Sequence, residues 1–216
     1  MQFYDLFPVS VFHANLGRDI TEKELSVAMQ HSPEHMCDRR GSHRLSLERH
    51  VLDRHEEELF GIKEFIRQST SVYIQEIMSP PPTVEFYITN SWFTFNEPGA
   101  EHRPHCHQNC ILSGVFYFTG DGYNDAIDFI NYSRFKQIWL PVQWENHRNE
   151  ESRRMPANPG DLYIFPPDLY HAVPPTTSKS LRICMPYNVW IKGSIGEAYN
   201  INEAEVDWAM ELPVYK

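Results

Sequence analysis

The sequence lacks any apolar run long enough to span a bilayer, and its first residues show no basic region followed by an apolar core. We therefore expect a cytoplasmic protein without a membrane segment or an export signal. Cysteine is scarce, and its spacing is not the paired spacing of secreted disulfide scaffolds. Reduced thiols, in keeping with a cytoplasmic location, are the simplest interpretation of Cys37, Cys106, Cys110 and Cys184.

Positively charged residues are also fewer than negatively charged ones. Lysine and arginine together number 19 against 29 acidic residues, so the formal net charge is -10. A negative field of this kind repels nucleic acid and anionic lipid surfaces. We expect a small-molecule or protein substrate, whose identity the sequence does not give, and neither a nucleic-acid nor a membrane partner. Formation of a homo-oligomer stays open.

Glycine is less frequent than proline, with 10 residues against 16, and this indicates many strand ends and turns. Hydrophobic residues make up 41% of the chain and aromatic residues 13%, enough for a globular core in 216 residues. We expect a single domain over 1–216. Its parts are an N-terminal arm and helices over 1–83, a β core over 84–190 and a C-terminal extension over 191–216.

The N-terminal part shows one extended segment and two helical ones. Residues 3–16 alternate weakly and predict an edge strand or an arm. A capping box over 21–24 predicts a short helix that ends by Pro33. The polar stretch 31–50 is typical of a solvated loop, or of a lid. Apolar residues at three- and four-residue steps then predict a longer helix over about 53–78, before three prolines.

Beyond residue 83 the pattern changes from helical to β. Short runs rich in β-branched and aromatic residues alternate with turns. We expect strands over Val84–Ile88, Ser91–Phe95, Ile111–Thr119, Ala126–Ile130, Ile138–Val142, Leu162–Phe165 and Leu181–Trp190. The pattern therefore predicts a helical start and a mainly β body.

Two histidines, His105 and His107, stand at the end of one expected strand. Side chains two residues apart in an extended chain lie on the same face, so the two imidazoles converge. Neutral imidazole binds zinc, iron, copper and nickel alike. The pair therefore predicts one half of a metal site. His102, three residues earlier, is expected on the surface of the loop.

The other half is expected from residues 160–188. The apolar run that ends at Phe165 is stopped by two prolines, and after a short turn His171 begins another apolar stretch. This pattern predicts a strand, a corner and a second strand. Arg182 follows eleven residues later among apolar neighbours, where an inward-pointing charge needs a partner.

Four blocks of sequence resemble a known family. They are Asn90–Gly99, His105-x-His107 with Leu112–Tyr117, Gly160–His171, and Arg182–Asn188. In order and spacing they resemble the iron(II)- and 2-oxoglutarate-dependent oxygenases, and in particular a small bacterial and phage branch of that superfamily. The likeness covers roughly residues 84–190, and it is weaker in the N-terminal helices. Agreement of four blocks is more specific than any one of them.

The resemblance implies a mainly β fold, a double-stranded β-helix (a jelly-roll, cupin-like barrel of about eight strands) with N-terminal α-helices packed outside. It implies a 2-oxoglutarate-dependent dioxygenase, with Fe(II) as metal and 2-oxoglutarate as co-substrate. Such a hydroxylase couples decarboxylation of 2-oxoglutarate to oxidation of a second substrate, here unknown. The implied metal ligands are His105, His107 and His171. Arg182 is implied to bind the far carboxylate of 2-oxoglutarate, with help from Tyr117.

One departure from the superfamily leaves alternatives open. Most members carry His-x-Asp or His-x-Glu, whereas this chain has His-x-His. Either His107 is the second ligand, or a carboxylate such as Glu101 or Asp121 ligates and His107 lies behind it. A three-histidine set also suits zinc or nickel. The alternative function is a cupin-like metal protein that does not use 2-oxoglutarate: a three-histidine dioxygenase, an isomerase or a metal-dependent binding module. Such a protein has no need of Arg182.

Overall fold

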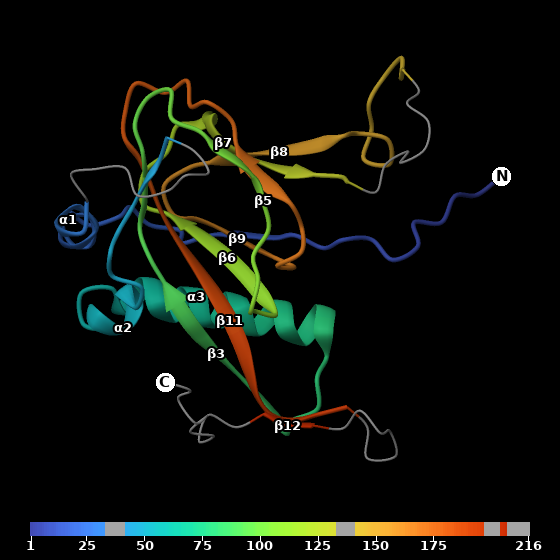
Figure 1. The fold of residues 1–216 in the computed structure, drawn as a ribbon, viewed down its shortest axis with the longest axis horizontal. Coiled ribbons are helices and arrows are strands. Elements are labelled where there is room, and N and C mark those ends of the chain that lie inside the picture. The colour runs from blue at the N-terminus through green and yellow to red at the C-terminus, as the bar shows by residue number, and fades with distance from the viewer. Residues whose placement is uncertain (33–41, 133–140, 197–203, 207–216) are drawn as a thin grey trace, which may run out of the picture.

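The structure is a computed structural model that describes residues 1–32, 42–132, 141–196 and 204–206. Its body consists of two antiparallel β-sheets, one of eight strands and one of four. The helices cover one face of the larger sheet (Figure 1). Within the described ranges, no helix combines the length and the apolar character needed to cross a membrane.

The described chain has four helical segments before the main strands. They are α1 (Glu22–Gln30), α2 (Val51–Arg54), α3 (Phe60–Tyr73) and the π-helical turn η1 (Ile74–Met78). The predicted capping box opens α1. The Thr21 hydroxyl accepts from the Glu24 backbone N–H at 3.2 Å, and the Glu24 carboxylate accepts from the Thr21 N–H at 2.8 Å. Two of the orphan N–H groups at the start of α1 are thereby satisfied.

The larger sheet has the strand order β1-β9-β6-β11-β4-β2, with β3 and β12 also paired to β11. Its strands are β1 (Phe12–Asn15), β2 (Arg44–Leu45), β3 (Val84–Ser91), β4 (Thr94–Asn96), β6 (Leu112–Tyr117), β9 (Asp161–Phe165), β11 (Arg182–Ile195) and β12 (Ala204–Val206). The smaller sheet has the order β5-β10-β7-β8. Its strands are β5 (His102–His105), β7 (Gly122–Ile130), β8 (Ser152–Ala157) and β10 (His171–Val173).

Side chains of β11 show that one face of the larger sheet packs on the helices and the other on the smaller sheet. Ile183 and Met185 belong to the apolar cluster shared with the helices. Cys184, between them, belongs to a second cluster with Tyr117 of β6 and Phe129 of β7, which fills the space between the two sheets. Two facing sheets with helices outside form the double-stranded β-helix that the sequence implies. The predicted fold class is therefore confirmed.

The three-part division of the chain stays a prediction. β1 and β2 contribute strands to the larger sheet from the expected N-terminal part, and β11 continues past residue 190 to Ile195. The expected edge strand within 3–16 is present as β1, at one end of the larger sheet.

The prediction of one helix over 53–78 is wrong. The chain turns after α2, and α3 begins at Phe60. The break brings Lys63 Nζ to 3.1 Å from the Asp53 carboxylate and 3.0 Å from that of Glu56. In a straight helix, Asp53 and Lys63 would stand about 15 Å apart along the axis, beyond any ion pair. The turn between α2 and α3 thus lets the carboxylates of Asp53 and Glu56 share one cation, Lys63.

The prediction of a solvated loop over residues 31–50 is wrong for the last part of this stretch. His43 and Ser46 are fully buried, and β2 pairs with β4. Ser46 is buried because its hydroxyl bridges two backbone groups: it donates to the Glu48 carbonyl and accepts from the Phe93 N–H, each at 2.9 Å. Residues 33–41 of this stretch lie outside the described part of the chain.

Two strand predictions also need correction. Most of the strand expected over 138–142 lies outside the described residues, and its last two positions are not in a strand. Strand β8 was not predicted, because Ser152–Ala157 shows no apolar alternation. Its pairing depends on β7 instead: Arg154 lies opposite Asp128 and forms a two-pronged ion pair, with both N···O distances 2.8 Å.

A pair of histidines joins α1 to α2 and predicts a pH dependence of stability. His31 Nε2 lies 2.7 Å from His55 Nε2, and the His31 ring stacks on Phe93. Burial, and then the neighbouring His55, lower the pKa of His31 below its ordinary value of 6.5. Arg54 adds to this and Glu48 opposes it. Folded His31 therefore stays neutral at pH values where the unfolded chain binds a proton.

Below pH 6.5 the unfolded state binds more protons at His31 than the folded state does. The contribution of His31 to stability is therefore fully present above pH 6.5 and is lost as the pH falls toward the lowered pKa of the folded state. We expect the free energy of unfolding of the wild type to fall more steeply between pH 7 and 5 than that of His31→Gln. For one proton the difference in slope is at most about 1.4 kcal/mol per pH unit. Urea unfolding at several pH values measures it. Identical slopes would contradict the assignment.

Candidate metal centre

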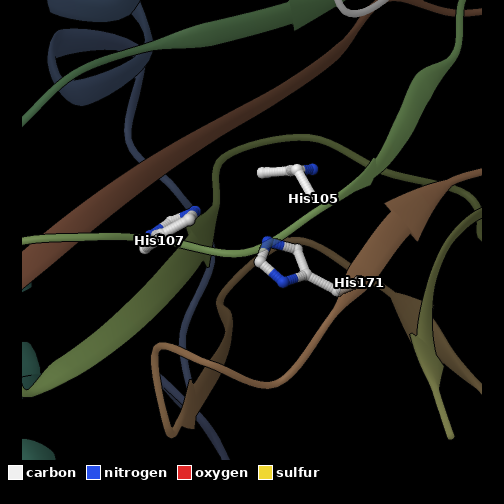
Figure 2. Close-up of side chains that lie close together, drawn as sticks. All are labelled: His105, His107 and His171. Carbon is white, nitrogen blue, oxygen red and sulfur yellow. The ribbon is translucent and has the colours of Figure 1, made fainter. Parts of the chain in front are cut away.

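Two histidines at strand ends of the smaller sheet and a third just beyond one of those strands come together at one place. The candidate ligand atoms of His105, His107 and His171 all lie within 4.8 Å of one another. His105 ends β5 and lies directly opposite His171, which opens β10. His107 follows two residues later, where its backbone N–H donates to the Pro167 carbonyl at 2.8 Å. Figure 2 shows the three rings around a common space.

The outer ring nitrogens fix the orientation of two of these histidines. His105 Nδ1 lies 2.9 Å from the Arg103 carbonyl, and His171 Nδ1 lies 3.0 Å from the Leu169 carbonyl. A carbonyl only accepts, so each Nδ1 must carry the proton and donate it. The lone pair of each ring is then on Nε2. This is the arrangement in which histidine binds a metal through one nitrogen while an oxygen acceptor holds the other.

His107 is held in the same way, but by two side chains. Its Nδ1 lies 2.8 Å from Asn188 Oδ1 and 2.8 Å from Ser113 Oγ. Ser113 in turn donates to Asn188 Oδ1 at 2.8 Å. Ser113 and Asn188 lie directly opposite each other on β6 and β11. The sequence showed both residues within the family-like blocks, but it could not show that the strand register places them behind His107.

Electrostatics favour the neutral, metal-binding form of His171. His171 is buried, and burial, followed by the nearby His105 and His107, holds its pKa well below the ordinary value of 6.5. Three neutral imidazoles with inward lone pairs fit a divalent transition metal. The donor set fits Fe(II), and by itself it does not select iron over zinc or nickel.

Neither carboxylate weighed for the second ligand position belongs to this cluster. Within the described ranges, the only group of three or more potential ligands is the three histidines. Glu101 lies 3.8 Å from Arg103 in an exposed ion pair. Asp121 accepts from the Asn124 amide at 3.0 Å. The arrangement favours His107 over both acids.

The expected surface position of His102 is wrong. His102 lies in β5, half-buried, and its ring stands 3.8 Å from that of His43 and 3.9 Å from that of His105, measured between ring centres. The pairing of β5 with β10 at Val173 and His102 draws it into the sheet. Pro104 follows closely in the same strand, which an edge strand tolerates.

Arg182 is buried between the two sheets, with 1% of its surface exposed. Its Nε donates to the Asp125 backbone carbonyl at 3.0 Å, and its Nη1 donates to Asn96 Oδ1 at 3.0 Å. The Asp125 carboxylate is bound elsewhere, by Ser178 Oγ at 2.6 Å and the Asp121 N–H at 2.9 Å. Among the described residues, the guanidinium has only uncharged hydrogen-bond acceptors.

Tyr117 completes the surroundings of this cation. Its hydroxyl accepts from Arg182 Nη2 at 3.2 Å, and the guanidinium carbon lies 5.0 Å from the centre of its ring. Burial raises the pKa of Tyr117 far above its ordinary value, so the hydroxyl keeps its proton at neutral pH. The pair offers one full positive charge and a neutral donor inside the fold. That combination suits the carboxylate of a ligand.

The comparison with protein families agrees with this arrangement. Residues 90–188, which contain all five predicted site residues, match the family described as "Putative 2OG-Fe(II) oxygenase". This match confirms the predicted resemblance to the iron(II)- and 2-oxoglutarate-dependent oxygenases, a class of enzymes. The chain's place in a bacterial and phage branch stays a prediction. No protein of curated function matches the sequence.

Solved structures of the same fold are distant in sequence. The epimerase SnoN, solved with Fe³⁺, α-ketoglutarate (2-oxoglutarate) and nogalamycin RO, superposes with a TM-score of 0.56 at 10% identity, over 86% of this chain and 81% of its own. A Pseudomonas putida prolyl-4-hydroxylase gives 0.52 at 13%, over 86% and 95%. A Trichoplax adhaerens prolyl hydroxylase, solved with a hypoxia-inducible factor peptide, gives 0.54 at 9%, over 83% of each chain. At these identities the likeness supports the fold.

Proposed function

We propose that this protein is an Fe(II)- and 2-oxoglutarate-dependent hydroxylase that oxidises a substrate still to be identified. The observation that carries the proposal is the presence, in one fold, of the three-histidine cluster and a buried guanidinium whose hydrogen-bond acceptors, among the described residues, are all uncharged. The Asp125 carboxylate acts on this cation only through space, because its hydrogen bonds come from Ser178 and the Asp121 N–H. A buried charge without a directly bonded counter-ion is costly, so a ligand carboxylate that bonds the guanidinium would stabilise it.

Each named residue has a distinct part in this proposal. His105, His107 and His171 would hold Fe(II), which activates O₂ for the oxidative decarboxylation of 2-oxoglutarate to succinate. Arg182 binds the far carboxylate of 2-oxoglutarate through its planar guanidinium, and the Tyr117 hydroxyl donates to the same carboxylate. Together they orient the keto acid with its other end toward the histidines.

The aromatic interior adds an environment that excludes water. Phe165 and Phe129 pack against the His171 ring, with ring centres 4.8 Å and 6.3 Å away. Tyr163 and Tyr117 continue this layer toward Arg182. In such surroundings the attraction between Arg182 and a carboxylate is stronger than in water. Three neutral imidazoles also leave the charge of Fe(II) unbalanced, and the dianionic co-substrate balances it.

The direct test is to add 2-oxoglutarate to the protein loaded with Fe²⁺ under anaerobic conditions. We expect the weak visible charge-transfer band of the iron–keto acid chelate, and slow succinate formation once air is admitted. The same titration with succinate serves as the control and should give no band. A protein that binds Fe²⁺ but gives neither the band nor succinate would not be this enzyme.

A second candidate function rests on His107. Its clamp by Asn188 and Ser113 favours a three-histidine site, whereas the oxygenase pattern has two histidines and one carboxylate. A cupin-like metal protein that does not use 2-oxoglutarate, such as a three-histidine dioxygenase, an isomerase or a metal-dependent binding module, would have such a site. Metal binding without any response to 2-oxoglutarate would favour it. The cupin-like alternative, however, gives the buried Arg182 no ligand to bind.

Replacement of His107 by aspartate tests how far the site depends on a neutral ligand. We expect His107→Asp to bind Fe²⁺ as tightly as the wild type or more tightly, because a negative ligand is added and Ser113 can donate to it. The measurement is iron affinity by competition with a chelator, with His107→Ala as control. Complete loss of iron in His107→Asp would instead show that the Asn188 and Ser113 clamp accepts only imidazole.

A further inference from the structure

Asn96 lies beside Arg182 in the space between the two sheets. β4 pairs with β11 so that Asn96 stands directly opposite Arg182, and directly opposed residues share a face. Arg182 and Cys184 are two residues apart on β11, and Cys184 belongs to the interior cluster. Phe95, the neighbour of Asn96 on β4, packs on the helix side. Asn96 itself has 0% of its surface exposed.

The orientation of the Asn96 amide follows from its neighbour. Its Oδ1 accepts from Arg182 Nη1 at 3.0 Å, and a flipped amide would place two donors against each other. The Nδ2 group therefore occupies the other side of the amide. It is fully buried and has no hydrogen-bond partner in the described part of the chain. An unpaired buried donor is costly, so Nδ2 points to a group that joins it on binding.

Two more donors lie around the same guanidinium. Arg182 Nη2 carries two hydrogens, and one of them goes to the Tyr117 hydroxyl. That hydroxyl accepts this bond and keeps its own hydrogen, which the high pKa of Tyr117 retains at neutral pH. Nη2 and the tyrosine hydroxyl can therefore donate to an anion beside Arg182, and the unpartnered Asn96 Nδ2 is a third buried donor on a side chain that contacts the same guanidinium.

We propose that Asn96 is a further binding residue for the far carboxylate of the keto-acid co-substrate, and that it contributes to selection for a carboxylate at that end. The inference rests on the proposed function. A carboxylate only accepts hydrogen bonds and offers about four lone-pair sites, enough for three convergent donors. A terminal amide would bring its own N–H groups against these donors and would be rejected.

The test is calorimetric titration under anaerobic conditions into the protein loaded with Mn²⁺, which replaces iron without redox chemistry. For Asn96→Ala we expect roughly 10- to 100-fold weaker binding of 2-oxoglutarate, the effect of one hydrogen bond to a charged group. Pyruvate, a 2-oxo acid without the far carboxylate, should bind equally well to both proteins. Phe95→Leu, a change on β4 that faces the helices, controls for a general loss of order in this strand and should leave the 2-oxoglutarate affinity unchanged.

Asn96→Asp tests the same geometry by placing a carboxylate, instead of a donor, beside Arg182. The new carboxylate would pair with Arg182, so thermal unfolding of the metal-free protein should occur at the same temperature or a higher one. Binding of 2-oxoglutarate should weaken by more than roughly 100-fold, because the cation is occupied and two carboxylates repel. Aspartate has the shape of asparagine and leaves no cavity, so the thermal unfolding of the variant shows whether a loss of affinity comes from unfolding.

The outcomes separate this inference from the proposed function. If Arg182→Met loses affinity for 2-oxoglutarate but Asn96→Ala and Asn96→Asp bind it within twofold of the wild type, the role of Asn96 is refuted and the oxygenase proposal stands. An equal loss of pyruvate and 2-oxoglutarate binding in Asn96→Ala also refutes it, because the effect would not concern the far carboxylate. If Arg182→Met binds 2-oxoglutarate normally, the proposed function itself fails.

Discussion

Arg182→Met is expected to weaken binding of 2-oxoglutarate by roughly 30-fold to several thousand-fold, which corresponds to about 2 to 5 kcal/mol for the loss of a buried charged partner. Methionine is similar in length and apolar, so the variant removes the charge without leaving a large cavity. Among the described residues, the hydrogen-bond partners of the guanidinium are Asp125, Asn96, Tyr117 and Cys184, which are not members of the histidine cluster. Metal content should therefore stay that of the wild type.

Arg182→Lys should recover only part of this affinity. A lysine ammonium is a point charge and cannot reproduce the planar, two-pronged contact of a guanidinium with a carboxylate. Arg154→Met is a matched control, since Arg154 pairs with Asp128 on the exposed side of the smaller sheet. The measurement is calorimetric titration of 2-oxoglutarate into anaerobic, Fe²⁺-loaded protein. Equal affinity in the wild type and Arg182→Met would remove the main support for the oxygenase and favour the cupin-like alternative.

His105→Ala and His171→Ala are expected to lower metal affinity by more than roughly 100-fold, because the loss of a ligand exceeds the 10- to 100-fold typical of a residue that only supports one. Each wild-type chain should carry one divalent metal, at about 2.0 to 2.2 Å from the imidazole nitrogens. Metal analysis after dialysis gives the content, and a structure with metal bound gives the distances.

His13→Ala is the control for that experiment. His13 is a half-exposed histidine of β1 that stacks on Tyr163 and bonds to Asp161, and the metal cluster does not include it. It should keep its full metal content. If His105→Ala and His171→Ala also kept theirs, the three-histidine assignment would be wrong.

The sequence predicted much of the site because its candidate ligands stand in or beside strands and follow the chain in a recognisable order. His105 and His107 are two residues apart, and an extended backbone alone turns both to one face. His171 follows a strand and a proline corner, which β9 and β10 confirm. The place of Arg182 in a buried strand was predicted as well, because apolar neighbours surround it in the sequence.

The supporting residues could not be predicted in the same way. Ser113 and Asn188 are 75 positions apart, and Asn96 and Arg182 are 86 apart. Each pair depends on the register between two strands, and a shift by one residue would turn every side chain to the other face. The two apolar clusters on the faces of the larger sheet fix that register by burial, and this is a property of the whole fold.

By itself, the sequence determined the fold class, the resemblance to a family and the grouping of three histidines, since these follow from local periodicity and from the order of motifs along the chain. The tertiary structure decided which polar residues serve them. His102 became a strand residue stacked on His105, the expected long helix divided between α2 and α3, and Asn96 came to lie beside a buried cation. The reason is that buried polar groups and charges must find partners. Those partners come from strands that are distant in the chain and adjacent only after the two sheets have packed.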